Sequence, residues 1–490
     1  MKKITGFYLF FLAVFLLLEI CLSLSLPLTG LYLLLGPLFL LKINAQKLTL
    51  KSYGQGLFWV GVICYLLLPF SPLSLIRLLE HFPLPLTVTN AFFYKRIFWL
   101  GLLGGLYLVG YYVCLRLLPS SNLQLLTEKN FLQQLRKNFD TSRSKHTFVF
   151  LILLFFSAVT FLGTTLAVSD LMVVGKVSAL GYFVSVSVSK QILLLWLLHQ
   201  RLSFETRTLN FKASLFFLTL AVCGSAFVTW QKLTLPREKI PLIISHRGVD
   251  GTDGVQNTIP ALIKTHQRAH PAYVELDIQL TLDQHFVVSH DEDLRKLAKK
   301  ELHINQSPLE ELTKVQVFEH AKKAPLADFT LYLAKAQQLD QPLLIEFKLG
   351  NVPVSPYVTQ FLTLYGKEIK KDQIHSMDLL AITTLKRSLP KASAGFILPF
   401  VLFGLPKNQA DFYSVSAPTV TKEFITKAHK DHKKIYLWTL EQKKQALEAQ
   451  TLGADAIITD EPSQIKASLQ TATPVDHFKA KVRLLLKGAL

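Results

Sequence analysis

The sequence predicts two units, an α-helical transmembrane domain of about seven spans followed by an α/β TIM-type (β/α)8 barrel. Three observations predict this division. Up to Trp230 the chain carries 19 Lys or Arg and 6 Asp or Glu, against 34 and 28 in the remainder, which together make the 53 and 34 of the whole chain. Long apolar segments fill the first part, and short β-rich runs alternate with helical patterns in the second. We therefore expect a membrane domain over 1–231, a linker over 232–240, a barrel over 241–470 and a basic tail over 471–490.

Seven apolar segments of the first part are candidate spans, because about twenty apolar residues cross the hydrocarbon core of a bilayer. They cover residues 4–24, 27–42, 54–75, 97–118, 147–169, 178–198 and 212–230. The first segment follows two lysines, as a signal peptide would, but more apolar segments follow it and no small-residue cleavage site is evident. We expect it to be a span. Lys190, near the middle of the sixth segment, is either a functional group or a lysine that snorkels from a broken or shifted span.

Lysines and arginines in the loops predict the orientation, since they concentrate on the cytoplasmic side. The loops around Lys47, over 119–146 and over 199–212 are basic, whereas the opposite loops are poorer in positive charge. Seven spans from a cytoplasmic N-terminus place the barrel outside the cell, next to the lipid bilayer. One span more or fewer would reverse this expectation.

The charge and cysteine content exclude some function classes. The net charge of +19 comes mainly from the basic loops beside the apolar segments, which fits anionic lipid headgroups better than nucleic acid. We expect no nucleic-acid partner, because no basic stripe is interleaved with aromatic residues. The four cysteines all lie in the apolar segments, so the second unit has neither a disulfide framework nor a cysteine zinc site. The tail is either a basic amphipathic helix on a membrane or a solvated or frayed end.

The second unit contains eight β-rich runs separated by helical patterns, which is typical of a (β/α)8 barrel. The runs are 242–245, 273–278, 343–347, 373–376, 395–398, 412–415, 435–439 and 456–459. A ninth run, 285–289, follows the second too closely for a parallel crossover and predicts a hairpin. If its turn centres on residues 283 and 284, paired positions sum to 567 and His290 faces Asp277.

Three carboxylates fall on barrel strands. Glu275 and Asp277 share one face of the second run by the strand period of two, and Glu346 lies near the end of the third. Unpaired, they would raise one another's pKa, whereas a hard divalent cation would resolve the repulsion. The alternative is that they are surface or ion-paired carboxylates, which the apolar neighbours of Glu275 and Glu346 disfavour.

Histidines and cations follow the same strand ends. His246 and His290 titrate near neutral pH and suit acid–base work on either side of a phosphorus, the alternative being structural histidines. Arg247 offers a planar fork for phosphate oxygens and Lys348 a point charge. A structural ion pair for the arginine and a solvated position for the lysine are the alternatives.

Taken together, these residues resemble the glycerophosphodiester phosphodiesterase family. The resemblance covers about 242–468 and depends on four motifs, with weaker support from Trp438-Thr439 and from residues 453–462. The motifs are Ser245-His246-Arg247-Gly248, Val274-Glu275-Leu276-Asp277, Val288-Ser289-His290-Asp291 and Leu344-Ile345-Glu346-Phe347-Lys348. The first unit resembles the membrane domain that some Gram-positive members of the family carry ahead of the barrel.

The resemblance implies a metal-dependent hydrolase that cleaves a glycerophosphodiester into glycerol 3-phosphate and an alcohol. It implies that His246 and His290 are catalytic, that Glu275, Asp277 and Glu346 bind Ca²⁺ or Mg²⁺, and that Arg247 and Lys348 bind phosphate. Trp438 would line the end of the barrel that binds the substrate, although the alternative is that it is a core tryptophan. One position departs from the family, since Gln256 stands where Glu is common, which puts in doubt a metal or proton role for that side chain.

The leading hypothesis is a membrane-anchored, outward-facing phosphodiesterase. Its substrate would be a glycerophosphodiester from phospholipid turnover, a lysophospholipid or a glycerol-phosphate polymer of the wall. A transporter, channel or sensor with the barrel as a non-catalytic binding module is the alternative from another class, and a catalytically silent scaffold is a third.

Overall fold

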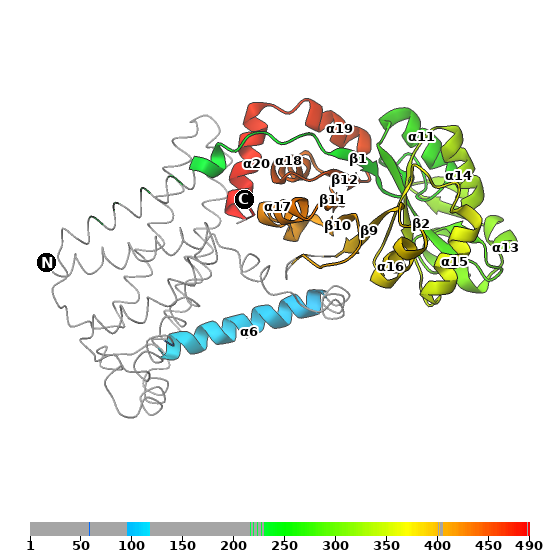
Figure 1. Cartoon of the computed structure of the whole chain (residues 1–490), viewed down its shortest axis with the longest axis horizontal. Helices are drawn as coiled ribbons and strands as arrows, with labels where there is room; N and C mark the ends of the chain where they lie inside the picture. The colour runs from blue at the N-terminus through cyan, green and yellow to red at the C-terminus, as the bar shows by residue number, and fades with distance from the viewer. Residues whose placement is uncertain are drawn as a thin grey trace. The chain divides into compact units, whose positions relative to one another are not determined.

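The computed structural model describes residues 230–399, 401, 405–487 and 489–490, the helix 96–117, and the single residues 58, 216, 219, 223 and 227. These residues fall in two compact units, one with the helix 96–117 and one with residues 236–484 (Figure 1). Most of the seven predicted spans, and Lys190, lie outside the described residues.

α6 (Arg96–Leu117) is a 22-residue helix at the position of the fourth predicted span. Its side chains Leu106 and Val109 are exposed. Within the described residues, no helix combines the length and the hydropathy that a membrane span requires. The transmembrane domain therefore stays a prediction.

The second unit is a closed barrel of eight parallel strands, as predicted. The strands are β1 (Leu242–Ser245), β2 (Tyr273–Leu280), β7 (Leu343–Phe347), β8 (Gln373–Ser376), β9 (Ser393–Leu398), β10 (Phe412–Ser416), β11 (Lys434–Trp438) and β12 (Ala456–Thr459). Each pairs with the next, and β1 pairs with both β12 and β2, which closes the ring. All eight strands coincide with predicted runs to within a few residues, because each is a short apolar stretch between turn-forming residues.

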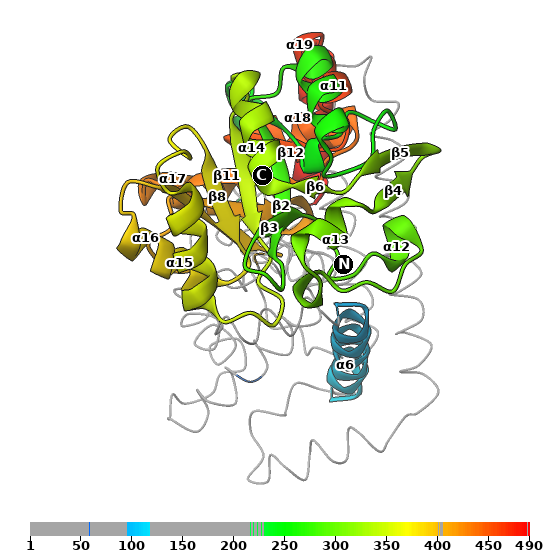
Figure 2. The ribbon, with the colours of Figure 1, turned by 90° about the vertical axis from the view of Figure 1, so that its right-hand side faces the viewer.

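Helices lie outside the strands of the barrel (Figure 2). They are α11 (Ile259–Ala269), α14 (Phe329–Gln338), α15 (Val354–Tyr365), α16 (Leu379–Ser388), α17 (Lys422–Lys430), α18 (Lys443–Leu452), α19 (Pro462–Gln470) and α20 (Pro474–Leu486). α11 shows why they form: Thr258 caps its N-terminus, and Ala261, Leu262, Thr265 and Ala269 are buried at helical spacing. In the tail, α20 forms ion pairs with α18 through Asp476–Lys443 and Arg483–Glu448, so it is not a frayed end.

An insertion separates β2 from β7. It contains β3 (Phe286–Val288), α12 (Arg295–Ala298), a 3-10 turn at Ile304–Gln306, α13 (Leu309–Thr313), β4 (Gln316–Glu319), β5 (Lys322–Pro325) and β6 (Ala327–Asp328). Two further 3-10 turns, His246–Gly248 and Ala417–Thr419, lie elsewhere in the barrel unit. β3 adds to β2 and β6 adds to β3, whereas β4 and β5 form a separate hairpin.

The hairpin of β2 and β3 is confirmed, but its predicted register is wrong by one residue. The observed pairs, such as Gln279 with Val287, sum to 566. The turn is closed by the Thr281 hydroxyl, which donates to Asp283 and accepts from the His285 amide, and Gln284 adopts a left-handed conformation with φ of 64°. Ser289, not His290, therefore lies opposite Asp277, and its amide donates to the Asp277 carbonyl at 2.9 Å.

Apolar side chains fill part of the barrel interior and leave the carboxyl ends of the strands for polar ones. Ile244, Leu344, Phe412, Tyr436, Ala456 and Ile458 form one buried cluster. The rings of Phe412 and Tyr436 stack at 4.5 Å, and Gly395 is required beside them because a Cβ there would lie 2.1 Å from the Phe412 ring.

Candidate active site

The predicted polar residues gather where β1, β2, β7 and β8 end. The parallel register pairs Asp277 of β2 with Glu346 of β7, and Glu346 with His375 of β8. Neighbouring parallel strands bring such positions together at one edge of a barrel. Two of the three predicted metal ligands are therefore direct cross-strand neighbours.

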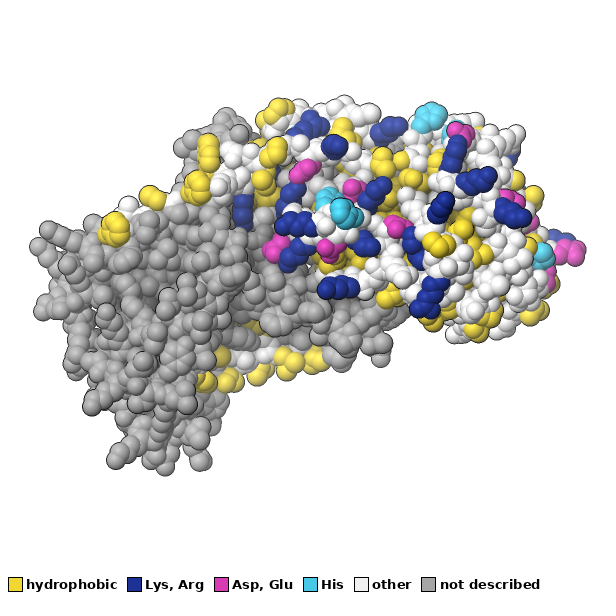
Figure 3. All heavy atoms as spheres, viewed as in Figure 1, with side chains coloured by type: hydrophobic (Ala, Val, Ile, Leu, Met, Phe, Trp, Pro, Cys, Tyr) yellow, Lys and Arg dark blue, Asp and Glu magenta, His cyan; other side chains and the backbone are white. Residues whose placement is uncertain are grey.

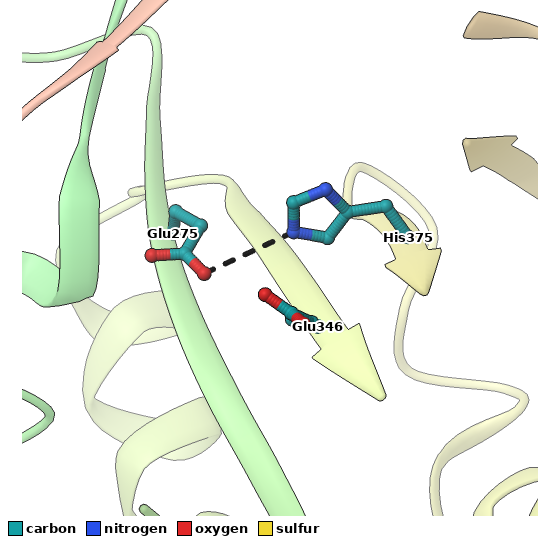
Figure 4. A group of neighbouring side chains, drawn as sticks. All are labelled: Glu275, Glu346 and His375. Carbon is teal, nitrogen blue, oxygen red and sulfur yellow. Dashed lines mark ion pairs between the residues drawn. The ribbon is translucent and has the colours of Figure 1, made fainter. Parts of the chain in front are cut away.

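Glu275, Glu346 and His375 point toward one another (Figure 4). One ligand atom from each lies within 4.8 Å of the others, and all three residues are buried. The sequence reasoning named both glutamates but missed His375, which stands in an ordinary-looking run, Gln373-Ile374-His375-Ser376. Among the described residues, Glu275, Glu346 and His375 are the His, Cys, Asp and Glu side chains that lie close enough together to hold a metal ion.

Asp277 lies beside this group and contacts cations and an amide. Its Oδ1 is 3.4 Å from Lys348 Nζ, and its Oδ2 is 3.6 Å from Arg247 Nε and accepts from Asn257 Nδ2 at 2.9 Å. Burial alone would raise its pKa, but Lys348, His290, Arg247 and the amide of Asn257 hold the pKa well below the usual range. Asp277 is therefore a carboxylate held ionised, and its role as a metal ligand stays a prediction.

Lys348 lies between two of the carboxylates. Its Nζ is 2.6 Å from Glu346 Oε1 and 3.4 Å from Asp277 Oδ1. Burial lowers the pKa of Lys348, but the charges of Glu346 and Asp277 outweigh burial and raise it. For Glu346 itself, burial raises the pKa more than Lys348 lowers it. The lysine thus stays charged and offsets part of the negative charge of the site.

Each predicted catalytic histidine forms a hydrogen bond to an aspartate. His246 Nδ1 lies 2.7 Å from Asp460 Oδ1, and Asp460 directly follows β12. His290 Nδ1 lies 2.7 Å from Asp291 Oδ1. An aspartate on Nδ1 fixes the orientation of the ring and leaves Nε2 for a reacting group. Asp460 was predicted only as part of a weakly supporting motif, although its position at a strand end was the signal for a larger role.

The pKa of His246 is raised. Burial of the imidazole lowers the pKa, but the hydrogen bond to Asp460 and the charge of Glu275 together outweigh burial. The pKa of Asp460 is lowered, since its hydrogen bond with His246 and the charge of that ring outweigh the effect of burial. His246 therefore keeps its proton to a higher pH than an ordinary histidine.

The backbone turns sharply after β1 to place these groups. Arg247 has φ of 51°, and its amide donates to Glu275 Oε2 at 2.7 Å. Gly248 has φ of 71°, and a Cβ there would lie 2.8 Å from the Tyr332 hydroxyl. This turn therefore needs glycine, and it fixes His246 and Arg247 against a carboxylate of the cluster.

Gln256 connects the arginine to the insertion. Its Oε1 accepts from Arg247 Nη1 at 2.5 Å, and its Nε2 donates to Glu319 Oε1 at 2.6 Å. Its backbone amide also donates to Glu319 Oε2 at 3.0 Å. The amide side chain thus links a cation to a carboxylate that comes from β4, and no sequence pattern predicted Glu319.

Trp438 ends β11 and is partly buried. It packs against the interior cluster of Phe412, Tyr436 and their neighbours, and its indole Nε1 has no hydrogen-bond partner among the described residues. Both predicted roles, in the core and at the substrate end, are compatible with this position, so the substrate contact stays a prediction.

Comparison with known proteins agrees with the geometry. Residues 246–390 match the profile of the glycerophosphoryl diester phosphodiesterase family. A putative glycerophosphodiester phosphodiesterase of Bacillus subtilis, YhdW, is 26% identical over 238 residues, covering 46% of this chain and 96% of that protein. A glycerophosphodiester phosphodiesterase of Caldanaerobacter subterraneus is 26% identical over 235 residues, with the same two coverages.

More distant matches include a lysophospholipase D of Rattus norvegicus, 26% identical over 274 residues, covering 46% of this chain and 85% of that protein. Among solved structures, an Oleispira antarctica phosphodiesterase in complex with sn-glycerol-3-phosphate is 18% identical with a TM-score of 0.43, covering 47% of this chain and 98% of that chain. The matched segment contains His246, Glu275, His290 and Glu346. Residues 246–390 are therefore similar to the glycerophosphoryl diester phosphodiesterase family, and this segment includes most of the strands and loops that form the candidate site.

Proposed function

We propose that the protein is a membrane-anchored, metal-dependent phosphodiesterase that hydrolyses glycerophosphodiesters to glycerol 3-phosphate and an alcohol. One observation carries the proposal: two histidines, each fixed through Nδ1 by an aspartate, lie at the end of a barrel beside a buried cluster of carboxylates and cations. Acid–base catalysis at a phosphodiester needs two such groups and a cationic site for the phosphate.

The two imidazoles divide the proton transfers. His246, whose pKa is raised by Asp460 and Glu275 against the lowering effect of burial, donates a proton from Nε2 to the departing alkoxide. His290 accepts a proton from the attacking water molecule, and Asp291 stabilises the imidazolium that forms. The P–O bond to the alcohol breaks as the bond to the attacking oxygen forms.

Arg247 and Lys348 bind the phosphate oxygens in this proposal. Their side chains are about one fifth exposed, at 19% and 22%, so both can reach a ligand from the buried cluster. Within the described part of the chain, Arg247 Nε is buried without a hydrogen-bond partner, which leaves it one donor for an incoming anion. Trp438, at the end of β11, would cover the apolar part of the substrate.

The donor set fits a divalent cation. Glu275, Asp277 and Glu346 would hold it, since three buried carboxylates beside only one lysine and one arginine leave oxygen lone pairs for a cation. When bound, such an ion supplies Lewis-acid stabilisation of the charge that develops on phosphate oxygens. The resemblance implies Ca²⁺ or Mg²⁺ as the ion.

The first unit supports the membrane anchor, and the relatives support the class of substrate. The seven apolar segments and their basic loops support a multi-pass membrane protein with the barrel outside the cell. A barrel held at the bilayer would meet lysophospholipids or glycerol-phosphate polymers as readily as small glycerophosphodiesters. One relative is a lysophospholipase D, which supports the lipid substrate.

The experiment is an activity assay on the purified full-length protein. Release of glycerol 3-phosphate is measured from glycerophosphocholine, from a lysophospholipid and from a glycerol-phosphate polymer, with chelator and with added Ca²⁺ or Mg²⁺. We expect chelator-sensitive hydrolysis of at least one diester. A protein that is folded yet inactive on all three substrates under every metal condition would contradict the proposal. Protease treatment of intact cells tests the orientation separately, since a protected barrel would mean that it faces the cytoplasm.

A further inference from the structure

His375 occupies an unusual place for a histidine. It lies inside β8, paired with Glu346 of β7, and its ring is 6.4 Å from that of Phe412. Only 2% of the residue is exposed. Figure 4 shows its imidazole directed at the carboxylates of Glu275 and Glu346.

Neither ring nitrogen of His375 has a hydrogen-bond partner among the residues that the structure describes. The nearest carboxylate oxygen, Glu275 Oε1, is 3.8 Å from Nε2, which is beyond hydrogen-bond distance. A buried polar group without a partner costs about 1–3 kcal/mol, so such groups are rare in folded proteins. By contrast, His246 and His290 each bind an aspartate through Nδ1. His375 therefore has a nitrogen free and aimed into the carboxylate cluster.

We propose that His375 is a nitrogen ligand of the divalent ion, together with Glu275 and Glu346. One atom from each residue lies within 4.8 Å of the others, and two ligands of one ion are at most about 4–5 Å apart because each bond is about 2.0–2.6 Å long. The inference rests on the proposed function in that it concerns the metal of the same site. It adds a ligand that the motifs of the chain did not indicate.

The added nitrogen changes which ions the site prefers. Ca²⁺ and Mg²⁺ bind through oxygen atoms, whereas imidazole favours first-row transition ions. A site in which an imidazole is added to the carboxylates therefore favours Mn²⁺, Co²⁺ or Zn²⁺ over Ca²⁺. Asp277 remains beside this set, with its oxygens on Lys348, Arg247 and Asn257.

The test measures metal binding directly on the full-length protein, freed of metal by chelation. Mn²⁺ and Ca²⁺ are titrated calorimetrically, and the Mn²⁺ complex is examined by pulsed electron paramagnetic resonance for coupling to ¹⁴N. We expect Mn²⁺ to bind more tightly than Ca²⁺ and to show imidazole coupling that changes to the ¹⁵N pattern when the protein is labelled with ¹⁵N-histidine. The labelling arm uses the unchanged protein and does not depend on whether a variant folds.

The variant His375→Gln keeps a polar side chain of similar size and removes the imidazole. We expect Mn²⁺ affinity to fall at least about 10- to 100-fold, the loss typical when a group that supports a metal site is removed, with a smaller change for Ca²⁺. The matched control is His432→Gln, an exposed histidine before β11 at the opposite end of the barrel, which should change neither quantity.

Three results would overturn the assignment of His375: no ¹⁴N coupling in the Mn²⁺ complex, unchanged coupling and affinity in His375→Gln, or Ca²⁺ binding as tight as that of Mn²⁺. Failure of the proposed function is a different result. A protein that binds Mn²⁺ through His375 yet hydrolyses no diester would contradict the function alone, and an active phosphodiesterase without imidazole coupling would contradict the ligand alone.

Discussion

The two sides of the candidate site are held in place by different means. Glu275, Glu346 and His375 lie on strands and are buried, so the parallel register alone fixes their spacing. His246 and His290 lie just beyond strand ends, with side chains 22% and 34% exposed, and each is oriented by an aspartate. The comparison teaches that the sheet itself fixes the buried cluster, whereas the more exposed histidines beyond the strand ends each need a separate aspartate for orientation.

The strand side should give the largest loss of activity. Glu346→Gln removes one carboxylate of the proposed metal site and leaves Lys348 without its closest carboxylate partner. We expect kcat to fall at least about 10³-fold, because Lewis-acid stabilisation is worth several kcal/mol and each 1.36 kcal/mol is a factor of ten. Steady-state kinetics with saturating metal measure the loss. Chelation followed by metal addition restores the unchanged protein but not the variant, and an active variant would separate the carboxylate from catalysis.

The histidine side should give the next largest loss. His246→Ala and His290→Ala each remove one proton-transfer group, and we expect kcat/KM to fall by about 10²- to 10⁴-fold in each. Metal affinity should stay unchanged, since neither residue belongs to the buried group of ligands. His432→Ala is the matched control. Full activity in either variant would remove that histidine from the mechanism.

The aspartate partner should produce a smaller loss with a change in pH dependence. In the proposed mechanism His246 acts as the acid, so activity should fall as the pH rises through the pKa of His246. Burial lowers that pKa, but the hydrogen bond that His246 donates to Asp460 and the charge of Glu275 raise it by more. Asp460→Asn removes this effect, and we expect the basic limb of the kcat–pH profile to move to lower pH, with kcat reduced about 10- to 100-fold. Asp291→Asn is the control, and it should leave the basic limb in place; an unmoved limb in Asp460→Asn would contradict the assignment of His246 as the acid.

The connection between Arg247 and the insertion should have the smallest effect. Gln256→Glu places a carboxylate against Glu319, where the amide now donates at 2.6 Å, and we expect a loss of stability of about 1–2 kcal/mol. The double variant Gln256→Glu/Glu319→Gln restores an amide facing a carboxylate and should recover most of that loss. Thermal unfolding of the two single variants and the double variant gives the coupling, expected at about 0.5–3 kcal/mol. Additive effects would show that the two side chains act independently.

Much of this site was predictable from local pattern. Short apolar runs predicted the eight strands, and the period of two placed Glu275 and Asp277 on one face. The register of the hairpin was not predictable, because the left-handed Gln284 changes the turn by one residue without changing composition. His375 was missed because its proximity to Glu275 and Glu346 depends on the pairing of strands that are distant in sequence. Glu319 lies 63 residues from Gln256, in an insertion whose pattern indicates no partner.

The bridge from Arg247 through Gln256 to Glu319 also bears on how such barrels can be recombined. The loop after β1 lacks the acidic residue that is common in the family, and β4 supplies a carboxylate in contact with the glutamine. The two segments therefore form one exchangeable unit. A chimera that receives a loop with glutamate at position 256 while Glu319 stays would place two carboxylates in contact, whereas a loop with glutamine there keeps the amide between Arg247 and Glu319.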